Sequence, residues 1–229
     1  KNTDDLITAT QSLGNKAILK TNSFGYDGKG QFRINSNSNL FEIWEKLGAV
    51  ECVLEELLDF KREISIMYFK STDNTDGFFP LSENFHENGI LKKTIAPAIL
   101  NDAIKDELKL KTKKLSENLN FYGIIAIELF ELVDGRIIFN EIAPRPHNSF
   151  HWTLDGCENS QFDILIRTIC GLPVKDVKCN TRWEMKNIIG NDVNNLSEIY
   201  NNQNYLLNLY GKKNIKAGRK MGHYNRQII

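Results

Sequence analysis

The sequence predicts an α+β protein built mainly from antiparallel sheets that are flanked by helices, with a small C-terminal domain. Three observations carry this prediction: short runs of alternating apolar and polar residues, Asp-Gly and Gly-rich turns between them, and longer segments with helical spacing. Strands joined by short turns pair antiparallel, and helices interspersed among hairpins are typical of this fold class. The 229 residues suffice for one large domain or two small ones.

The first part of the chain is predicted to hold two helices and three strands around a glycine-rich loop. Each helix has a stop signal, because a glycine follows its last apolar residue. In chain order, we expect a helix over Asp4–Leu13, a strand over Lys16–Lys20, a strand in "QFRIN", a helix over Asn39–Gly48 and a buried strand in "ECVLEELL" that runs into a linker.

The middle of the chain is predicted to be richer in strands. Arg62–Lys70 alternates with period two, and the stretch "TDNTDGFFPLSENFHENGIL" is interpreted as a hairpin followed by a polar segment. A helix begins near Asn101, and the strands "GIIAIELFELV" and "RIIFNEIA" follow it. A second helix begins at Ser160 and ends before Pro173, with one apolar stripe formed by Phe162, Leu165, Ile166 and Ile169.

We expect a domain boundary near Pro173, because the sequence beyond it is Asn-rich and less periodic. Residues 1–172 would form the main domain, divided into a glycine-loop subdomain over 1–60 and a metal and substrate subdomain over 61–172. Residues 173–229 would form the small C-terminal domain.

Composition excludes several classes of function. Lys plus Arg equals Asp plus Glu at 29 each, which gives no support for a protein that binds nucleic acid. No apolar run approaches the roughly 20 residues of a membrane span. The four cysteines lack the two-residue spacing of redox and zinc motifs, so we expect reduced thiols in a cytoplasmic protein.

The stretch "FGYDGKGQF" allows two interpretations. Gly and Asp are ordinary turn residues, so the stretch can be a simple hairpin loop. Glycines also let backbone N–H groups approach a phosphate closely, which would make the stretch a phosphate-binding loop. The loop alone does not decide between them.

Two carboxylates are predicted to face each other across a hairpin. Asp134-Gly135 is a strong hairpin signal, and a two-residue turn there pairs Val133 with Arg136 and Glu128 with Glu141. Like charges at such a position are destabilising. Either both side chains lie on a solvated face, or a divalent cation such as Mg²⁺ lies between them with help from Asn140.

Two further segments concentrate polar donors. "APRPHNSFHW" carries Arg145, His147, Asn148 and His151, whose guanidinium and imidazole groups suit a carboxylate, phosphate or carbonate ligand. These histidines can also be ordinary loop residues. "AGRKMGHYN" places Arg219 and Lys220 beside glycines, which by itself is a weak signal.

The order of these motifs resembles the ATP-grasp fold. More closely, "GYDGKGQ", "PLSENFHENGIL", "NEIAPRPHNS.HWT" and "GRKMGH" are similar to the N5-carboxyaminoimidazole ribonucleotide synthase family. The resemblance implies ATP-dependent carboxylation of 5-aminoimidazole ribonucleotide with bicarbonate through carboxyphosphate, a step of purine biosynthesis. It also implies Mg²⁺ and a homodimer.

The same resemblance implies a role for each matching residue. The ATP-binding residues would be Lys20, the loop Gly25, Tyr26, Asp27, Gly28, Lys29, Gly30 and Gln31, the adenine hinge Glu55, Glu56, Leu57 and Leu58, the ribose-binding Glu63, and His86, Asn140 and Glu141. The metal ligands would be Glu128 and Glu141. The substrate-binding residues would be Tyr26, Arg145, His147, Asn148, Arg219 and Lys220. The catalytic residues would be Asp27, Lys29, Arg145, His147 and Lys220.

Three departures from the family pattern are visible. The family has an N-terminal domain of roughly a hundred residues before the region matched here, and it continues past "GRKMGH", so we expect this chain to be part of a longer protein. Phe150 stands where the family usually has Gly, and its ring would reshape the substrate pocket. Two alternatives stay open: an ATP-grasp ligase for another acyl acid such as formate, or a nucleotide-binding module without turnover.

Overall fold

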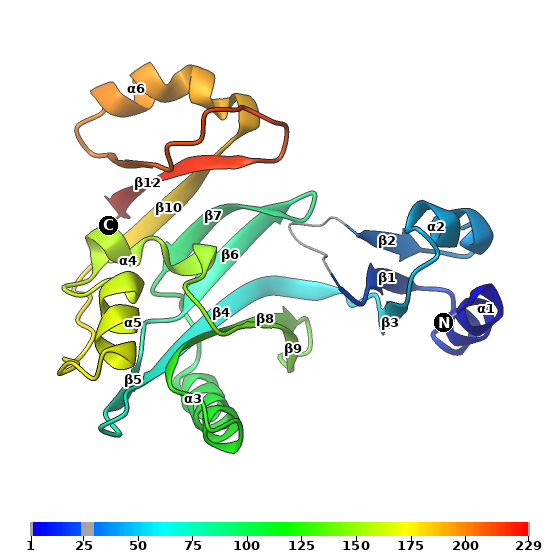
Figure 1. Ribbon diagram of the computed structural model, residues 1–229, viewed down its shortest axis with the longest axis horizontal. Helices are drawn as coiled ribbons and strands as arrows, with labels where there is room; N and C mark the ends of the chain where they lie inside the picture. Colours follow the sequence, from blue (N-terminus) through cyan, green and yellow to red (C-terminus); the bar gives the residue numbers. More distant parts are fainter. Residues whose placement is uncertain (1, 24–29, 229) are drawn as a thin grey trace. The chain divides into compact units, whose positions relative to one another are not determined.

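A computed structural model describes residues 2–23 and 30–228, which divide into two compact units (Figure 1). The first unit consists of Lys1–Asp59 together with Asn88–Ile90. The second consists of Phe60–Glu87 and Leu91–Ile229. Across the described ranges, no helix is both long and apolar enough to cross a lipid bilayer.

The first unit is a three-stranded antiparallel sheet with two helices. Leu6 of one helix and Trp44 of the other pack with Leu19 and Ile34 of the sheet in a single core. Asn2 and Asn39 cap the two helices by accepting backbone N–H bonds. In chain order the elements are α1 Thr3–Ser12, β1 Ala17–Thr21, β2 Gln31–Ile34, α2 Leu40–Lys46 and β3 Cys52–Glu56, with sheet order β2-β1-β3.

The expectation that "ECVLEELL" forms a buried strand is wrong. The strand exists as β3, but Val53 is exposed and Glu55 and Glu56 also face solvent. β3 is the edge strand of a sheet whose helices form one core, so burial covers only part of it.

The second unit is built on one nine-stranded sheet. The path through the sheet is β11-β12-β10-β7-β6-β4-β8-β9, and β5 pairs with β4. The strands are β4 Phe60–Lys70, β5 Asp76–Phe78, β6 Ser82–Glu87, β7 Ile90–Ala96, β8 Gly123–Leu132, β9 Ile137–Ala143, β10 Arg182–Ile189, β11 Leu206–Leu209 and β12 Lys220–Ile228. The helical segments are α3 Asp102–Asn118, η1 Asn148–Phe150, α4 Thr153–Gly156, α5 Gln161–Ile169, η2 Gly190–Asn195 and α6 Leu196–Asn201.

Both faces of the central strands are buried. Met67 and Phe69 belong to one core with Ile164 of α5, while Ile64 and Ile66 belong to another core with Leu108 of α3. Six consecutive residues of β4, Ile64–Phe69, are therefore buried, and the expected alternation of inside and outside fails there. A strand covered on both faces carries a continuous apolar run, which is typical of the centre of a covered sheet.

The stretch predicted to be a polar segment after the first hairpin forms a second hairpin, which was not predicted from the sequence. β6 and β7 are joined by Asn88-Gly89, and both turn residues have positive φ, at 52° and 76°. This is the backbone of a two-residue hairpin turn, in which Asn-Gly is strongly preferred. The hairpin places Asn84 and Thr94 inside the sheet, where Thr94 donates to Asn84 and Asn84 donates to Ser65.

Helix α5 buries a different face from the one predicted. Ile166 and Ile169 are 53 % and 59 % exposed, while Gln161, Ile164 and Thr168 are buried. The buried positions still follow helical spacing, but two of them are polar. Each is satisfied by hydrogen bonds, since Thr168 donates to the carbonyl of Leu165 and the Gln161 amide contacts a neighbouring loop.

The Asp134-Gly135 hairpin has the predicted carboxylate pairing, although its turn is different. The prediction of a two-residue turn is wrong, because the N–H of Leu132 donates to the carbonyl of Arg136 and three residues form the loop. Gly135 has a φ of 86°, as the last position of such a loop requires. One extra residue, Asn140, then forms a bulge between the pairs Leu129–Phe139 and Glu128–Glu141. The extra residue in the loop and the extra residue in the bulge shift the register in opposite directions, so Glu128 still pairs with Glu141.

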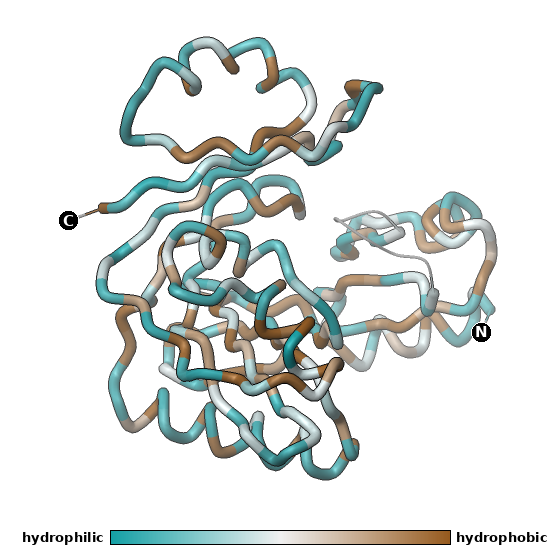
Figure 2. The backbone as a smooth tube through the Cα atoms, turned by 60° about the vertical axis from the view of Figure 1, so that its left-hand side comes forward, coloured by the Kyte–Doolittle hydropathy of each residue, from teal (hydrophilic) through white to brown (hydrophobic). Residues whose placement is uncertain are grey.

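Residues after Pro173 contribute three strands to the same sheet. β10 pairs with β7 and β12, and β11 pairs with β12 at the edge. Figure 2 shows hydrophilic residues along the stretch that leads to the C-terminus. The sheet is thus continuous across Pro173. The expectation that residues 173–229 form a separate small domain stays a prediction.

Gly222 on β12 pairs with Leu209 on β11, and the backbone of β11 lies close to it. A Cβ atom added there would lie 2.5 Å from the carbonyl oxygen of Asn208, which is backbone and has little freedom to move. We expect Gly222→Ala to lower the free energy of unfolding by about 1–3 kcal/mol through strain. Urea denaturation measures the loss, and hydrogen exchange should locate it in β11. Unchanged protection of the Tyr210 amide, which donates to the carbonyl of Met221 beside Gly222, would show that the strands have room for the methyl group.

Candidate active site

The centre of the candidate site is a pair of facing carboxylates in the second unit. Glu128 on β8 lies directly opposite Glu141 on β9, as predicted. Glu128 is only 9 % exposed, and among the described residues its Oε1 has no hydrogen-bond partner. Burial, followed by the nearby carboxylates of Glu141 and Glu63, raises the pKa of Glu128 to about 7 against the attraction of His86 and Lys220. A carboxylate in this position is costly without a counter-charge.

Glu63 and His86 complete a cluster of possible ligands around Glu128. Glu63 comes from β4 and His86 from β6, and one ligand atom of each lies within 4.8 Å of the others and of Glu128. His86 Nδ1 is 2.6 Å from Glu63 Oε2, which satisfies the distance of an ion pair, though not the angle of a hydrogen bond. Burial alone would lower the pKa of His86, but the Glu63 carboxylate outweighs it, and the net pKa is raised.

The loop after β9 brings His147 to the carboxylates. His147 Nδ1 lies 3.7 Å from Glu128 Oε1 and 2.8 Å from the hydroxyl of Ser149. Asn148 follows at the start of a 3₁₀ turn, and its Oδ1 is buried with no hydrogen-bond partner in the described part of the chain. Arg145 is exposed and donates to the carbonyl of Pro146. His147 thus lies at the carboxylate pair, Asn148 follows it in the chain, and Arg145 is exposed.

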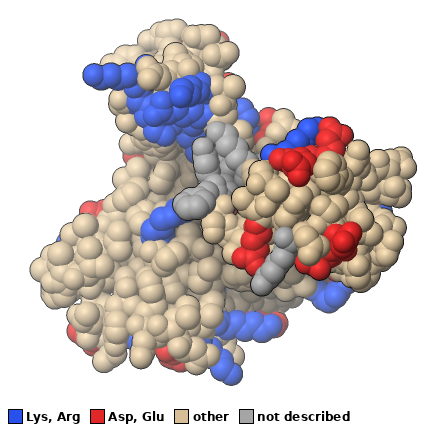
Figure 3. Space-filling model, turned by 45° about the vertical axis from the view of Figure 1, so that its right-hand side comes forward, with Lys and Arg blue, Asp and Glu red and all other residues tan. Residues whose placement is uncertain are grey.

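The basic segment near the end of the chain contributes Lys220. Lys220 begins β12, and its charge acts on both His86 and Glu128. Arg219 donates to the carbonyl of Asn214 within its own loop. Figure 3 shows Lys and Arg side chains gathered on the lobe formed by this part of the chain. The loop between β11 and β12 and the start of β12 carry Lys212, Lys213, Lys216, Arg219 and Lys220.

The predicted ATP-binding residues of the first unit form a separate group. Lys20 on β1 pairs with Glu55 on β3 at 2.5 Å. The N–H of Leu57 donates to the carbonyl of Lys16, while Glu56 and Leu58 lie on either side of it in the chain. Gly30 accepts from the N–H of Thr21, and Gln31 begins β2. Gly25, Tyr26, Asp27, Gly28 and Lys29 lie outside the described residues, so their assignments stay predictions.

The expectation that Phe150 reshapes a substrate pocket is wrong. Its ring is 0 % exposed and packs edge-on against Phe79, with the ring centroids 6.2 Å apart. The backbone of η1 turns the side chain at this position into the core of the second unit, away from the polar side chains that precede it.

Sequence reasoning missed the residues that support His147. Ser149 is buried and contacts the imidazole, and Gln161 at the start of α5 contacts the His147 backbone. Neither had a signal in the sequence, because a serine in a loop and a glutamine in the first turn of a helix are both common.

A second imidazole pair lies behind the His147 loop. The rings of His151 and His223 have centroids 5.2 Å apart, and Tyr210 lies 2.8 Å from His223 Nδ1. Burial lowers the pKa of His223 to about 4. Burial, with the charges of His223, His147 and Lys220, lowers the pKa of His151 to about 3. Both rings are therefore neutral at pH 7 and are not cationic anion-binding groups.

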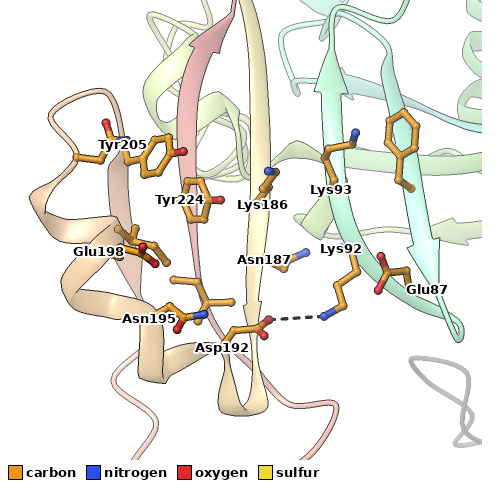
Figure 4. A pocket seen from close by; sticks show the side chains of 14 residues that line it. Glu87, Lys92, Lys93, Lys186, Asn187, Asp192, Asn195, Glu198, Tyr205 and Tyr224 are labelled. Carbon is orange, nitrogen blue, oxygen red and sulfur yellow. Dashed lines mark ion pairs between the residues drawn. The ribbon is translucent and has the colours of Figure 1, made fainter.

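A cavity of about 780 Å³ lies elsewhere in the second unit, between the sheet and the η2–α6 segment (Figure 4). Lys93 and Lys186 face each other across β7 and β10, and Lys92 pairs with Asp192 at 3.5 Å. The lining holds three lysines and the three acids Glu87, Asp192 and Glu198. This balance favours no charged ligand, and none of the carboxylate-site residues lines the cavity.

The fold and the site define the class of protein. The model of the ATP-grasp domain matches residues 1–162, and the chain belongs to the ATP-grasp family. The model of the phosphoribosylaminoimidazole carboxylase C-terminal domain matches residues 184–226.

Two similar curated proteins carry the name N5-carboxyaminoimidazole ribonucleotide synthase. The protein of that name from Bacillus subtilis is 40 % identical, over 97 % of this chain and 59 % of the relative. The Brucella melitensis protein is 36 % identical, over 97 % of this chain and 62 % of the relative. The chain thus spans about three-fifths of the length of these relatives.

Solved structures agree with this placement. The Staphylococcus aureus N5-carboxyaminoimidazole synthetase complexed with ADP has a TM-score of 0.91 and 37 % identity, over 98 % of this chain and 60 % of that one. The Aspergillus clavatus synthase in complex with ADP and 5-aminoimidazole ribonucleotide has a TM-score of 0.84 and 31 % identity, over 99 % and 61 %. The fold expected from the resemblance is confirmed.

Proposed function

We propose that the protein carrying this chain is an ATP-dependent ligase that carboxylates 5-aminoimidazole ribonucleotide with bicarbonate. Carboxyphosphate would be the intermediate, and N5-carboxyaminoimidazole ribonucleotide, ADP and phosphate the products. The observation that carries the proposal is the buried Glu128 carboxylate, which faces Glu141 and lies beside His147. A relative of similar fold solved with ADP and 5-aminoimidazole ribonucleotide supports it.

The carboxylate pair fits Mg²⁺. Glu128 and Glu141 face each other, and the unpartnered Oε1 of Glu128 is an oxygen of the kind that Mg²⁺ prefers. Asn140 is the bulged residue beside Glu141 and offers a further oxygen nearby. When bound, Mg²⁺ would neutralise charge on the transferred phosphoryl group.

The remaining assignments divide between the two units. In the second unit, Glu63 and His86 would contact the nucleotide. In the first unit, Lys20 and the loop Gly25–Gln31 would hold the phosphates, and Glu55–Leu58 would hold the adenine. These roles are implied by the resemblance, and the ion pairs Lys20–Glu55 and Glu63–His86 show that each lysine or histidine already lies next to an acid.

The donors around His147 would bind the anionic substrates. Lys220 and Arg145 supply positive charge, which stabilises anions and the charge that develops during acyl transfer. The Ser149 hydroxyl contacts one ring nitrogen of His147, Nδ1, and so holds the imidazole in place. Asn148 Oδ1 is buried without a partner among the described residues, so an amine on a bound substrate can satisfy it. Arg219 would assist from its loop.

The proposal is tested by following ADP release while one substrate at a time is omitted. We expect release only when ATP, Mg²⁺, bicarbonate and 5-aminoimidazole ribonucleotide are all present, with a carboxylated product identified by mass. ADP release that requires formate in place of bicarbonate would favour another ATP-grasp ligase. ATP binding without release under any combination would favour a nucleotide-binding module.

Two wider features of the proposal stay predictions. A homodimer follows from the resemblance alone, and a cytoplasmic location follows from it and from the expected reduced cysteines. The four cysteines, Cys52, Cys157, Cys170 and Cys179, are all free thiols in the structure.

A further inference from the structure

Gln161 is a polar residue with no access to solvent. It is the first residue of α5, directly after the helix cap Ser160, and its exposed fraction is 0 %. First-turn residues of a helix usually face water at least in part. Its own backbone N–H is satisfied inside the protein, because it donates to the hydroxyl of Thr153. The buried amide of Gln161 must therefore form its hydrogen bonds with other groups of the protein.

Those partners are the two backbone groups of a single residue. Gln161 Oε1 accepts from the N–H of His147 at 2.8 Å, and Gln161 Nε2 donates to the carbonyl of His147 at 3.0 Å. The amide thus contacts His147 as a neighbouring strand would. Only one orientation of the amide satisfies both contacts, because the backbone N–H requires an acceptor and the carbonyl requires a donor.

A third contact fixes the amide itself. Gln161 Nε2 lies 2.7 Å from His151 Nδ1. The second N–H of the amide donates to this nitrogen, which requires a neutral His151 ring with its proton on Nε2. The buried, neutral state of His151 described above meets this requirement. The amide oxygen and both N–H groups of Gln161 thus each have a hydrogen-bond partner in the loop that carries His147 and His151.

We propose that Gln161 is a positioning residue that holds the His147 backbone so that its imidazole stays between Glu128 and Ser149. His147 Nδ1 is 2.8 Å from the Ser149 hydroxyl and 3.7 Å from Glu128 Oε1, so a small shift of the loop would break both contacts. The role of His147 in this inference rests on the proposed function.

A purely structural anchor would stabilise the loop without tuning the site. The distinction lies in which kinetic constants change. Misplacement of a substrate-binding group by about 1 Å can cost about 100-fold in rate, while the ATP-binding residues are held by other elements. We therefore expect an effect on the bicarbonate and ribonucleotide steps that is absent from ATP binding.

The test compares Gln161→Met with Thr168→Val in the full chain. Both changes replace a buried polar side chain of α5 with an apolar one of similar size, but Thr168 bonds only within the helix. Gln161→Met should lower kcat/KM for bicarbonate and 5-aminoimidazole ribonucleotide by about 10- to 100-fold and leave the Kd of ATP unchanged. Thr168→Val should change neither.

Hydrogen exchange of the His147 amide gives a readout that does not need turnover. Gln161→Met should accelerate this exchange, and Thr168→Val should not. Suppose that the unmodified protein does not release ADP but that Gln161→Met accelerates exchange of the His147 amide. The proposed function then fails, while the contact between Gln161 and the His147 backbone is supported. If the unmodified protein is active and Gln161→Met alters neither the exchange nor the kinetic constants, the positioning role is overturned. Equal losses for ATP and for the other substrates would also overturn it.

Discussion

Glu128→Gln is expected to stabilise the metal-free protein at pH 8 by up to about 3 kcal/mol while lowering turnover by about 100-fold or more. The stabilisation arises because the amide removes a buried charge that faces Glu141 and whose Oε1 has no hydrogen-bond partner within residues 2–23 and 30–228. The loss of turnover arises because an amide is a poor substitute for a carboxylate at a magnesium site. Stability and activity therefore change in opposite directions.

The pH dependence has a definite sign. The pKa of Glu128 is raised from 4.5 to about 7 in the folded protein, a shift that corresponds to about 3 kcal/mol. The folded state binds the proton more tightly than the unfolded state, so this group costs nothing below pH 4.5. The cost grows as the pH rises from 4.5 to about 7 and is complete above that. Glu128→Gln should remove this slope from the stability of the EDTA-treated protein.

Glu131→Gln is the matched control for this prediction. Glu131 is a buried acid on the same strand, but Arg62 and Lys61 contact its carboxylate at 2.5 and 3.2 Å. Removing its charge leaves Arg62 short of a partner and should destabilise the protein. Urea denaturation between pH 4 and pH 8 measures both variants. A destabilising effect of Glu128→Gln at pH 8 in EDTA would show that its carboxylate is compensated in the metal-free state.

Phe150→Gly is expected to lower the free energy of unfolding by about 3–5 kcal/mol, a large part of the stability of an ordinary domain. The ring is fully buried and contacts Phe79 in the core of the second unit, so its removal leaves a cavity. Glycine adds conformational freedom to the unfolded chain, which increases the loss. Denaturation measured by circular dichroism determines the size of the effect.

Phe162→Ala serves as the control for the loss of an aromatic ring. Phe162 lies on α5, only a short distance along the chain, but its side chain is partly exposed. This variant should lose about 1–2 kcal/mol, less than Phe150→Gly, because 38 % of Phe162 is already exposed to solvent. If Phe150→Gly were as stable as Phe162→Ala and instead changed the affinity for a substrate, the ring would have to line a pocket after all.

The sequence predicted the carboxylate pair better than the turn that creates it. The Asp134-Gly135 signal correctly indicated a hairpin, but the choice between a two- and a three-residue loop depends on the twist of both strands. The bulge at Asn140 has no local signal, since an unpaired residue is defined by its partner strand. The prediction that Glu128 faces Glu141 was right because the longer loop and the bulge at Asn140 shift the register by one residue each, in opposite directions.

The buried faces were harder to predict because they depend on distant parts of the chain. Ile64–Phe69 looked like an amphipathic strand, yet helices α3 and α5 cover opposite faces of it. The apolar residues of α5 indicated one buried face, whereas the protein buries Gln161 and Thr168 instead. A polar residue is buried only where partners exist, and the partners of Gln161 lie in another segment.

The candidate site was predictable where function requires charge in an apolar strand, as at Glu128. Residues that act through backbone contacts, such as Gln161, were not predictable, because any helix can begin with a glutamine. The pairing of His86 with Glu63 also required the structure, since the stretch that carries His86 had been interpreted only as a polar segment, not as a hairpin.

The three-residue loop at the end of the β8–β9 hairpin is a suitable site for introducing a label. Val133 is 80 % exposed, and Glu128 lies five residues away along β8, or about 17 Å in an extended strand. The pairs between the loop and the bulge hold the two strands together independently of how many residues close the end. A short reporter peptide or a labelling cysteine can therefore be introduced there without displacing the carboxylates, since exposed loop tips tolerate insertions.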